Sequence, residues 1–236
     1  MTEPMTEPMT EPMTEPRARR PAAVLWDMDG TLVDTEPYWM ATEHALAAEF
    51  GGTWDEERAL QLVGSDLLDS GRFIQQHMPL PLTPEEIVER LLDGVVAQVE
   101  RAVPWRPGAR ELLADLGAAG VPCALVTMSY ERFVAPVLAA LPAGSFQAVV
   151  TGDAVERGKP DPEAYLVACR RLGVEPADCV AIEDSETGAR SAEAAGCTVL
   201  VVPHHVTPAP APARVFRDSL AALTAADLAS LAAAAA

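Results

Sequence analysis

Two aspartates separated by one residue follow a short apolar run near the start of the chain. Residues 22–26 lead directly into Asp27, Asp29 and Gly30, and this run predicts a strand that is buried on both faces. Carboxylates at the edge of a buried strand cost desolvation free energy unless a cation or hydrogen bonds offset it. Because folding alone gives no reason for this pair, we predict that Asp27 is a nucleophile and metal ligand, and that Asp29 is a general acid/base.

The spacing of the two acids fits a phosphoryl-transfer reaction. A carboxylate such as Asp27 is already ionised near pH 7, so it can attack phosphorus without a separate base. Side chains two positions apart in an extended chain point to the same side, so Asp29 can protonate the leaving alcohol and then activate water. Two solvent-exposed loop acids before a turn at Gly30 are the alternative interpretation.

A second polar position closes the apolar run at residues 121–126. There the hydroxyl of Thr127 and the backbone N–H of Met128 precede a predicted helix over residues 129–141. Because helix N-termini bind phosphoryl oxygens, we predict phosphate binding by Thr127 and by the backbone of Met128. The alternative is that Thr127 or Ser129 only caps the helix.

A lysine and an acid pair complete the candidate site. Lys159 lies in a Gly-Lys-Pro-Asp-Pro segment, where the prolines fix the backbone and the ammonium can stabilise charge on phosphoryl oxygens. Glu183 and Asp184 follow the apolar run at residues 179–182. With Asp27 they supply oxygen ligands, which suit Mg²⁺ better than zinc. We predict Asp184 as a metal ligand, and Glu183 either as a direct ligand or as a partner behind the ligands.

In this order, the four motifs resemble those of the haloacid dehalogenase (HAD) superfamily. The chain looks most like its phosphatase branch with a helical, C1-type cap after the first motif, as in proteins of the beta-phosphoglucomutase and phosphoglycolate phosphatase type. The resemblance runs from about residue 21 to about residue 205. It implies an α/β fold with a Rossmann-like parallel sheet of strand order 5-4-1-2-3. It also implies an aspartyl-phosphate intermediate and a metal bound by Asp27, the backbone carbonyl of Asp29, and Asp184.

The patterns along the chain divide it into four parts. Residues 1–20 begin with repeats of Met-Thr-Glu-Pro and predict a disordered acidic leader. Residues 37–105 show helical periodicity and a capping-box sequence, which predict an inserted helical cap domain. Residues 21–36 plus 106–205 alternate strand and helix, which predicts a parallel α/β core domain. Residues 206–236 predict a C-terminal extension, of which residues 214–220 return to the core and the Ala-rich end forms a helix.

Composition and charge exclude several classes of partner. The formal net charge of −18 disfavours nucleic acid and anionic membranes as partners, and no apolar run reaches the ~20 residues of a membrane helix. The same charge repels a phosphate ester, which is an indirect reason to expect a bound metal. The N-terminus lacks the apolar segment of a signal peptide, and four cysteines without a CxxC pair indicate buried, reduced thiols. We therefore expect a cytoplasmic monomer that acts on a small-molecule phosphate ester.

Together these features predict a Mg²⁺-dependent phosphatase for a small phosphate monoester, such as a sugar phosphate. One alternative is a sugar phosphomutase of the beta-phosphoglucomutase type, although that branch tends to carry histidine at the position of Trp39 and arginine at the position of Asp66. Another is a receiver-like module that accepts a phosphoryl group without turnover, although such a module has no inserted cap. The candidate substrate contacts in the cap are Trp39, Ser65, Asp66 and Arg72. The four histidines indicate neither a zinc site nor a catalytic triad.

Overall fold

A parallel β-sheet forms the centre of the molecule, and each strand follows from a short apolar run. The structure is a computed structural model that describes residues 20–62 and 65–234. Within these residues, six parallel strands form one sheet in the order β3-β2-β1-β4-β5-β6. The predicted order of five strands is confirmed, read from the opposite edge, and β6 adds a sixth. The strands are β1 (Ala23–Trp26), β2 (Cys123–Val126), β3 (Ala148–Val150), β4 (Cys179–Glu183), β5 (Thr198–Val201) and β6 (Arg214–Phe216).

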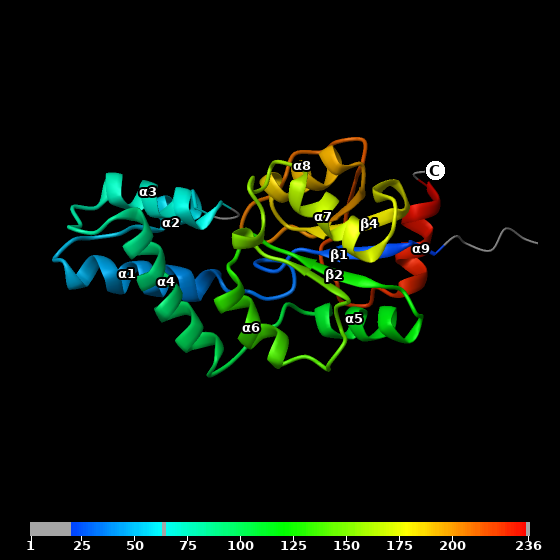
Figure 1. Cartoon of the computed structure of the whole chain (residues 1–236), viewed down its shortest axis with the longest axis horizontal. Coiled ribbons are helices and arrows are strands. Elements are labelled where there is room, and N and C mark those ends of the chain that lie inside the picture. Colours follow the sequence, from blue (N-terminus) through cyan, green and yellow to red (C-terminus); the bar gives the residue numbers. More distant parts are fainter. Residues whose placement is uncertain (1–19, 63–64, 235–236) are drawn as a thin grey trace, which may run out of the picture.

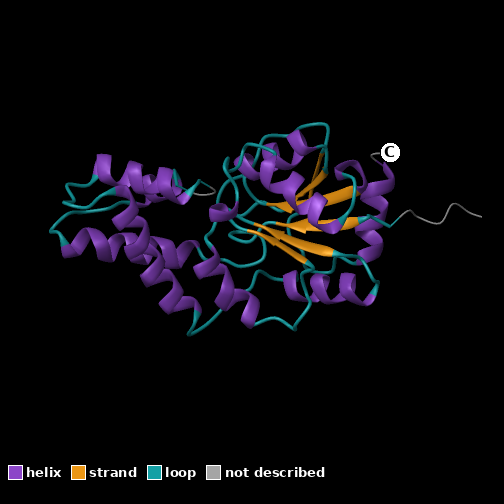
Figure 2. Ribbon diagram, in the orientation of Figure 1, coloured by secondary structure: helices purple, strands orange, loops and turns teal. Residues whose placement is uncertain are grey.

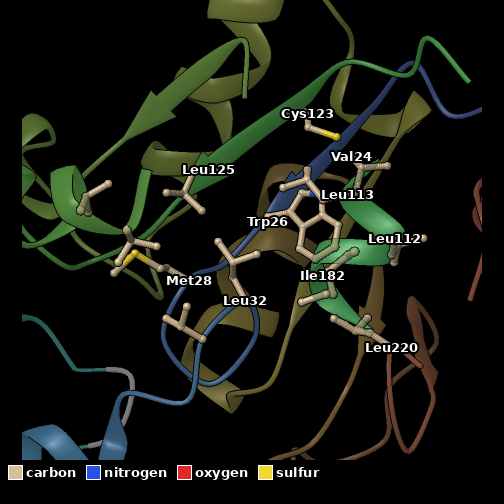
Figure 3. Packing of buried hydrophobic residues seen from close by; sticks show 14 of the residues in the cluster. Val24, Trp26, Met28, Leu32, Leu112, Leu113, Cys123, Leu125, Ile182 and Leu220 are labelled. Carbon is tan, nitrogen blue, oxygen red and sulfur yellow. The ribbon is translucent and has the colours of Figure 1, made fainter. Parts of the chain in front are cut away.

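Helices cover both faces of this sheet (Figure 1). Val24 and Trp26 of β1 pack against one helical layer, and Ala23 and Leu25 pack against the other, because side chains alternate along an extended strand. Figure 3 shows Trp26 packed beside Leu112 and Leu113 in the first of these clusters. The first layer contains α5 (Ala109–Ala118), α6 (Glu131–Ala139) and α9 (Ala225–Ala234), and the second contains α7 (Glu163–Leu172) and α8 (Glu186–Ala195).

A group of four helices projects from one end of the α/β part (Figure 2). It lies within residues 37–105 apart from its first residue, and has an apolar core of its own that includes Leu46, Ile74 and Leu91. The capping-box prediction is confirmed at the start of the fourth helix, where Thr83 and Glu86 bond each other's backbone N–H groups. The independence and limits of this cap domain stay a prediction. The helices are α1 (Glu36–Glu49), α2 (Glu56–Leu60), α3 (Leu67–His77) and α4 (Pro84–Val99).

Two antiparallel chain segments connect the cap helices to the sheet. Val33 forms a β-bridge with Trp105. On either side of it, the N–H of Asp34 donates to the carbonyl of Pro104 at 2.7 Å, and the N–H of Arg106 donates to Leu32 at 3.0 Å. The chain therefore enters and leaves the group of cap helices through one short antiparallel ladder.

The C-terminal region packs against the core. β6 pairs with β5, and Leu228 of α9 is buried in the same cluster as β1. Arg214 holds β6 in place because its guanidinium donates to Glu186 and Glu193 of α8. The predicted extension over residues 206–236 thus contributes a strand and a helix to the α/β part.

Several predictions concern the chain ends and the thiols. The leader predicted over residues 1–20 lies outside the described residues, apart from Arg20, which donates to the carbonyl of Ala119. The four cysteines are buried and free, as predicted. In the part of the chain that the structure describes, no helix combines the length and apolarity needed to cross a membrane. Two short 3-10 turns, η1 (Gly152–Ala154) and η2 (Pro176–Asp178), lie in the connecting loops.

Candidate active site at the carboxyl edge of the sheet

The sheet brings four of the predicted residues to one edge. Asp27 follows β1, Thr127 follows β2 and Asp184 follows β4, and β1 lies between the other two strands. Because parallel strands end at the same edge, these side chains meet where the following helices and loops begin. Lys159 enters from the loop between β3 and α7 and completes the group.

The ammonium of Lys159 connects two of the buried acids. Its Nζ donates to Asp27 Oδ1 at 2.6 Å, to Glu183 Oε1 at 2.6 Å and to the carbonyl of Val126 at 3.0 Å. Burial by itself lowers the pKa of a lysine, but the negative charges of Asp27 and Glu183 outweigh burial and raise the pKa of Lys159. The lysine therefore keeps its positive charge inside the site.

Glu183 is the most deeply buried acid of the group, with a side chain that is 0% exposed. Its Oε1 accepts from Lys159 and also from the hydroxyl of Tyr165 at 2.5 Å. A β-carbon at Gly188 would lie 2.1 Å from the Glu183 carboxylate, so that glycine leaves the room the acid occupies. These contacts hold Glu183 against Lys159 and Tyr165, and its role toward a metal stays a prediction.

Three carboxylates gather around this single ammonium. Asp27, Glu183 and Asp184 each offer one oxygen, and these atoms lie within 4.8 Å of one another. Asp184 comes close because Gly30 has no side chain: a β-carbon there would lie 2.0 Å from Asp184 Oδ2. The donor set consists of oxygen atoms and carries more negative than positive charge, which fits a hard divalent cation.

The protonation of these acids leads to the same conclusion. Burial, followed by the charge of Glu183, raises the pKa of Asp27 to about 7, although Lys159 opposes the shift. Burial, followed by the charges of Asp27 and Glu183, raises the pKa of Asp184 well above its ordinary value. One ammonium is therefore too little positive charge for three acids, and a bound cation would restore the ionised form of both aspartates.

Asp29 is held by a different set of groups, all of them hydroxyls. Its Oδ1 accepts from Thr35 Oγ1 at 2.5 Å, and its Oδ2 accepts from Ser129 Oγ at 2.7 Å and from Thr127 Oγ1 at 3.4 Å. Burial raises the pKa of Asp29, although the hydrogen bonds from Thr35 and Ser129 oppose the shift. A raised pKa favours the protonated carboxyl that a general acid needs.

Thr127 and Met128 shape the turn that follows β2. Thr127 Oγ1 accepts from the N–H of Ser129 at 3.0 Å, which is the kind of local contact that the capping alternative expects. The sulfur of Met128 accepts from the N–H of Lys159 at 3.1 Å, and a β-carbon at Gly158 would lie 3.0 Å from it. The methionine side chain therefore supports the backbone that carries the lysine.

A cleft with an empty volume of about 830 Å³, including its open mouth, extends from these residues toward the cap. Trp39 and Ser65 line it, and their contact with a substrate stays a prediction. The other two candidates have different roles: Asp66 accepts from the backbone N–H groups at the start of α3, and Arg72 pairs with Asp69 on the surface. These two side chains serve the helix and not the cleft.

A second group of polar side chains lies beside the cleft and contains two of the four histidines. The ligand atoms of Asp34, His204 and His205 lie within 4.8 Å of one another. Arg106 Nη1 lies 2.5 Å from His204 Nδ1. Because a guanidinium can only donate, His204 must carry its proton on Nε2, the nitrogen that faces Asp34. Burial lowers the pKa of His204, so the imidazole is neutral, and its Nε2 lies 2.9 Å from Asp34 Oδ1 without the geometry of a hydrogen bond.

Four hydroxyl groups of the site are not predicted from the sequence. Thr35 and Ser129 bind Asp29, Tyr165 binds Glu183, and the hydroxyl of Thr31 donates to Asp184 Oδ1 at 3.4 Å. The Gly-Thr after Asp29 is a local signal for Thr31, but the others reach the site only through the packing of separate elements.

Comparisons with known proteins agree with this geometry. The chain is 37% identical over 185 residues to hexitol phosphatase A of Escherichia coli strain K12. This match covers 75% of this chain and 81% of that protein. It is also 32% identical over 184 residues to the bifunctional riboflavin kinase/FMN phosphatase of Arabidopsis thaliana. That match covers 77% of this chain and 48% of the relative, so the chain spans about half of the bifunctional protein.

A solved structure and a family model agree with these relatives. CbbY from Rhodobacter sphaeroides, solved in complex with phosphate, has a TM-score of 0.77 to this chain at 31% identity. The comparison covers 85% of this chain and 95% of that chain. The family model of haloacid dehalogenase-like hydrolases matches residues 21–196, a span that begins just before β1 and includes every residue of the candidate site. The chain therefore belongs to the haloacid dehalogenase-like hydrolases.

Proposed function

We propose that this chain is a Mg²⁺-dependent phosphatase that hydrolyses a small phosphate monoester, such as a sugar phosphate, through an aspartyl-phosphate on Asp27. One observation carries the proposal: Asp27 lies at the carboxyl edge of the sheet in contact with Lys159 and within reach of Asp184. This arrangement gives a nucleophile, a cation and a second hard ligand at one point. The relatives that are named as phosphatases support the same reaction class.

The metal site that we propose uses Asp27 and Asp184 as ligands, together with the backbone carbonyl of Asp29. Glu183 stands behind them, because Lys159 and Tyr165 already occupy its Oε1. The raised pKa values of Asp27 and Asp184 support this assignment, since both acids lack a sufficient counter-charge. When bound, Mg²⁺ supplies positive charge for the oxygens of the phosphoryl group.

The residues of the chain divide the reaction into two steps. The Asp27 carboxylate attacks phosphorus and the bond to the leaving oxygen breaks, while the carboxyl of Asp29 gives its proton to that oxygen. Asp29, now ionised, takes a proton from water, which attacks the phosphorus of the aspartyl-phosphate and releases inorganic phosphate and free Asp27. Thr127, the N–H of Met128 and Lys159 are our candidates for holding the phosphoryl oxygens in both steps.

Two observations favour hydrolysis over isomerisation of a sugar phosphate. Trp39 lines the cleft at a position where the mutase branch tends to carry a histidine. Asp66 caps α3 where that branch tends to carry an arginine. The cap helices likewise disfavour a receiver-like module, which has no such insertion.

We further propose that the enzyme works as a cytoplasmic monomer on a small molecule, without nucleic acid or membrane partners. The buried free thiols suit a reducing compartment. The net charge of −18 disfavours polyanionic partners. Among the described residues, Val206 is the one large hydrophobic side chain that is strongly exposed, which supports a monomer.

The test is phosphate release from a panel of phosphate esters, with and without Mg²⁺. We expect the variant Asp27→Asn to lower kcat by at least about 1,000-fold, because an amide cannot attack phosphorus at a useful rate. Chelation should abolish the activity of the wild type, and added Mg²⁺ should restore it. The matched control is Asp69→Asn, which removes an exposed acid that pairs with Arg72. Activity of Asp27→Asn within about 10-fold of the wild type would refute the assignment of the nucleophile.

A further inference from the structure

The cap side of the cleft carries acids and hydroxyls but no basic side chain. Glu36, Glu43, Ser65 and Ser70 line it together with the indole of Trp39. Among the described residues that line the whole cleft, Lys159 is the only lysine or arginine. The Lys159 ammonium already donates hydrogen bonds to Asp27 and Glu183. The cleft therefore offers one cation at the phosphoryl end and none toward the cap.

None of the arginines among the described cap residues lines the cleft. Arg72 pairs with Asp69, and Arg90 pairs with Glu49, all on exposed parts of the helices. A second anionic group on a substrate would thus find no guanidinium beside it. Moving an anion from water into a partly buried site without a positive partner costs desolvation free energy. Repulsion between that anion and nearby acids is also stronger there than in water.

Glu43 is built into the wall of the cleft. It lies on α1 with 4% of its surface exposed, and its Oε2 accepts from the indole N–H of Trp54 at 2.7 Å. Glu36 lies two turns earlier on the same helix. Burial, followed by the charge of Glu43, raises the pKa of Glu36 to about 8, and burial raises the pKa of Glu43 to about 7. Within the described part of the chain, no cation compensates these acids, so they tolerate a neutral neighbour better than another anion.

We propose that Glu36 and Glu43 form an acidic wall that selects the alcohol half of the substrate. The wall admits a neutral, polyhydroxylated monophosphate and excludes esters that carry a second phosphate or a carboxylate. The hydroxyls of such a substrate donate to the glutamate oxygens and exchange hydrogen bonds with Ser65 and Ser70, while Trp39 packs against its C–H faces. This inference rests on the proposed phosphatase function and assigns its substrate class.

A matched pair of esters tests the acidic wall. Sorbitol 6-phosphate and 6-phosphogluconate share six carbons and one phosphate and differ at C1, where a hydroxymethyl group replaces a carboxylate. We expect the wild type to prefer sorbitol 6-phosphate by at least about 30-fold in kcat/KM. The carboxylate of 6-phosphogluconate is repelled by the two glutamates, and it also lacks the hydroxyl that would donate to them. Most of the difference should lie in KM.

Neutral variants of the wall connect the preference to these two residues. Measured at about pH 8.5, above both raised pKa values, Glu43→Gln and Glu36→Gln should each narrow the ratio at least about 3-fold, and the double variant at least about 10-fold, because each substitution then removes one negative charge. Glutamine at position 43 can still accept from Trp54, so the fold is retained; circular dichroism checks this. Glu49→Gln is the matched control, since Glu49 lies on the same helix but pairs with Arg90 away from the cleft, and it should leave the ratio unchanged.

The outcomes separate this inference from the proposed function. Equal kcat/KM for the two esters, or an unchanged ratio in the double variant, overturns the acidic wall and leaves the phosphatase intact. Hydrolysis of p-nitrophenyl phosphate without hydrolysis of either six-carbon ester has the same meaning. If glucosamine 6-phosphate exceeds glucose 6-phosphate by more than about 10-fold, the wall selects cations and not neutral polyols. If no ester is hydrolysed, the proposed function fails and the inference fails with it.

Discussion

Gly30 lets the carboxylate of Asp184 lie where a β-carbon would otherwise be, 2.0 Å from Oδ2. We predict that Gly30→Ala displaces Asp184 and lowers kcat/KM by at least about 100-fold, since a misplaced ligand loses both metal and geometry. Calorimetry should show weaker binding of Mg²⁺ to the variant. Part of any effect comes from backbone strain, because Gly30 has φ of +85°.

A second glycine separates strain from collision. Gly144 has φ of +80°, yet nothing lies within 4 Å of a β-carbon built there. Gly144→Ala should therefore lower the stability of the protein only by the cost of holding alanine in a left-handed conformation. The variant should keep its affinity for Mg²⁺. Equal loss of Mg²⁺ binding in both variants would contradict the role given to Gly30.

Glu43 makes stability depend on pH in a predictable direction. Its pKa is about 7 in the folded protein against 4.5 ordinarily, so between these values the folded chain keeps a proton that the unfolded chain has released. Stability is therefore lost as pH rises through this window. Glutamine resembles the protonated form, so we expect Glu43→Gln to exceed the wild type in unfolding free energy by less than about 1 kcal/mol at pH 5 and by about 3 kcal/mol at pH 8. Urea denaturation at the two pH values measures this, and an equal difference at both would contradict the raised pKa.

At the scale of elements, α4 carries the cap, because it packs against α1 and α3 and also against α6 of the core. Its first turn depends on Thr83, whose hydroxyl accepts from the N–H of Glu86. We predict that Thr83→Ala costs about 1 kcal/mol and lowers Tm by about 2–4 °C. Thr53→Ala, in the exposed loop after α1, is the control. A variant at Thr83 that melts like the control would show that the cap tolerates a frayed α4.

The central elements can be predicted because their environment is simple. β1, β2 and β4 are buried on both faces, so each must be a continuous apolar run, and the polar residue after each run marks the site. β6 has no such pattern. Its Arg214 is buried, and the acids that compensate it lie 28 and 21 residues earlier on α8. Only the packed structure brings them together, so the sequence predicts a return to the core near residues 214–220 but not the strand itself.

The same difference separates the predicted and the missed residues of the site. Asp27, Lys159 and Asp184 are conspicuous because a buried charge needs a reason. Tyr165 lies within α7 like any core aromatic, and its contact with Glu183 exists only because α7 crosses the sheet at that point. Thr35 likewise has the sequence of a helix start, whereas in the structure its hydroxyl binds Asp29.

At the scale of the whole molecule, the net charge of −18 opposes the approach of any phosphate ester. Raising NaCl from about 20 to about 200 mM shortens the screening length from about 20 Å to about 7 Å. At constant Mg²⁺ we predict that this lowers KM about 2- to 5-fold and leaves kcat unchanged, because salt weakens the long-range repulsion and not the contacts in the site. A KM that rises with salt would mean that local positive charge dominates the encounter.

The ladder between sheet and cap has a consequence for timing. Asp29 forms a β-bridge with Val33, and Val33 forms another with Trp105. Thr35, which follows the ladder in the chain, donates its hydroxyl hydrogen to the Asp29 carboxyl. Because Thr35 begins the passage into the cap helices, we expect any rotation of the cap about this ladder to change the hydrogen bonds of Asp29, the proton donor that we propose. Enclosure of a substrate under the cap and donation of the proton would then be coupled, and hydrolysis would depend on a closed cap.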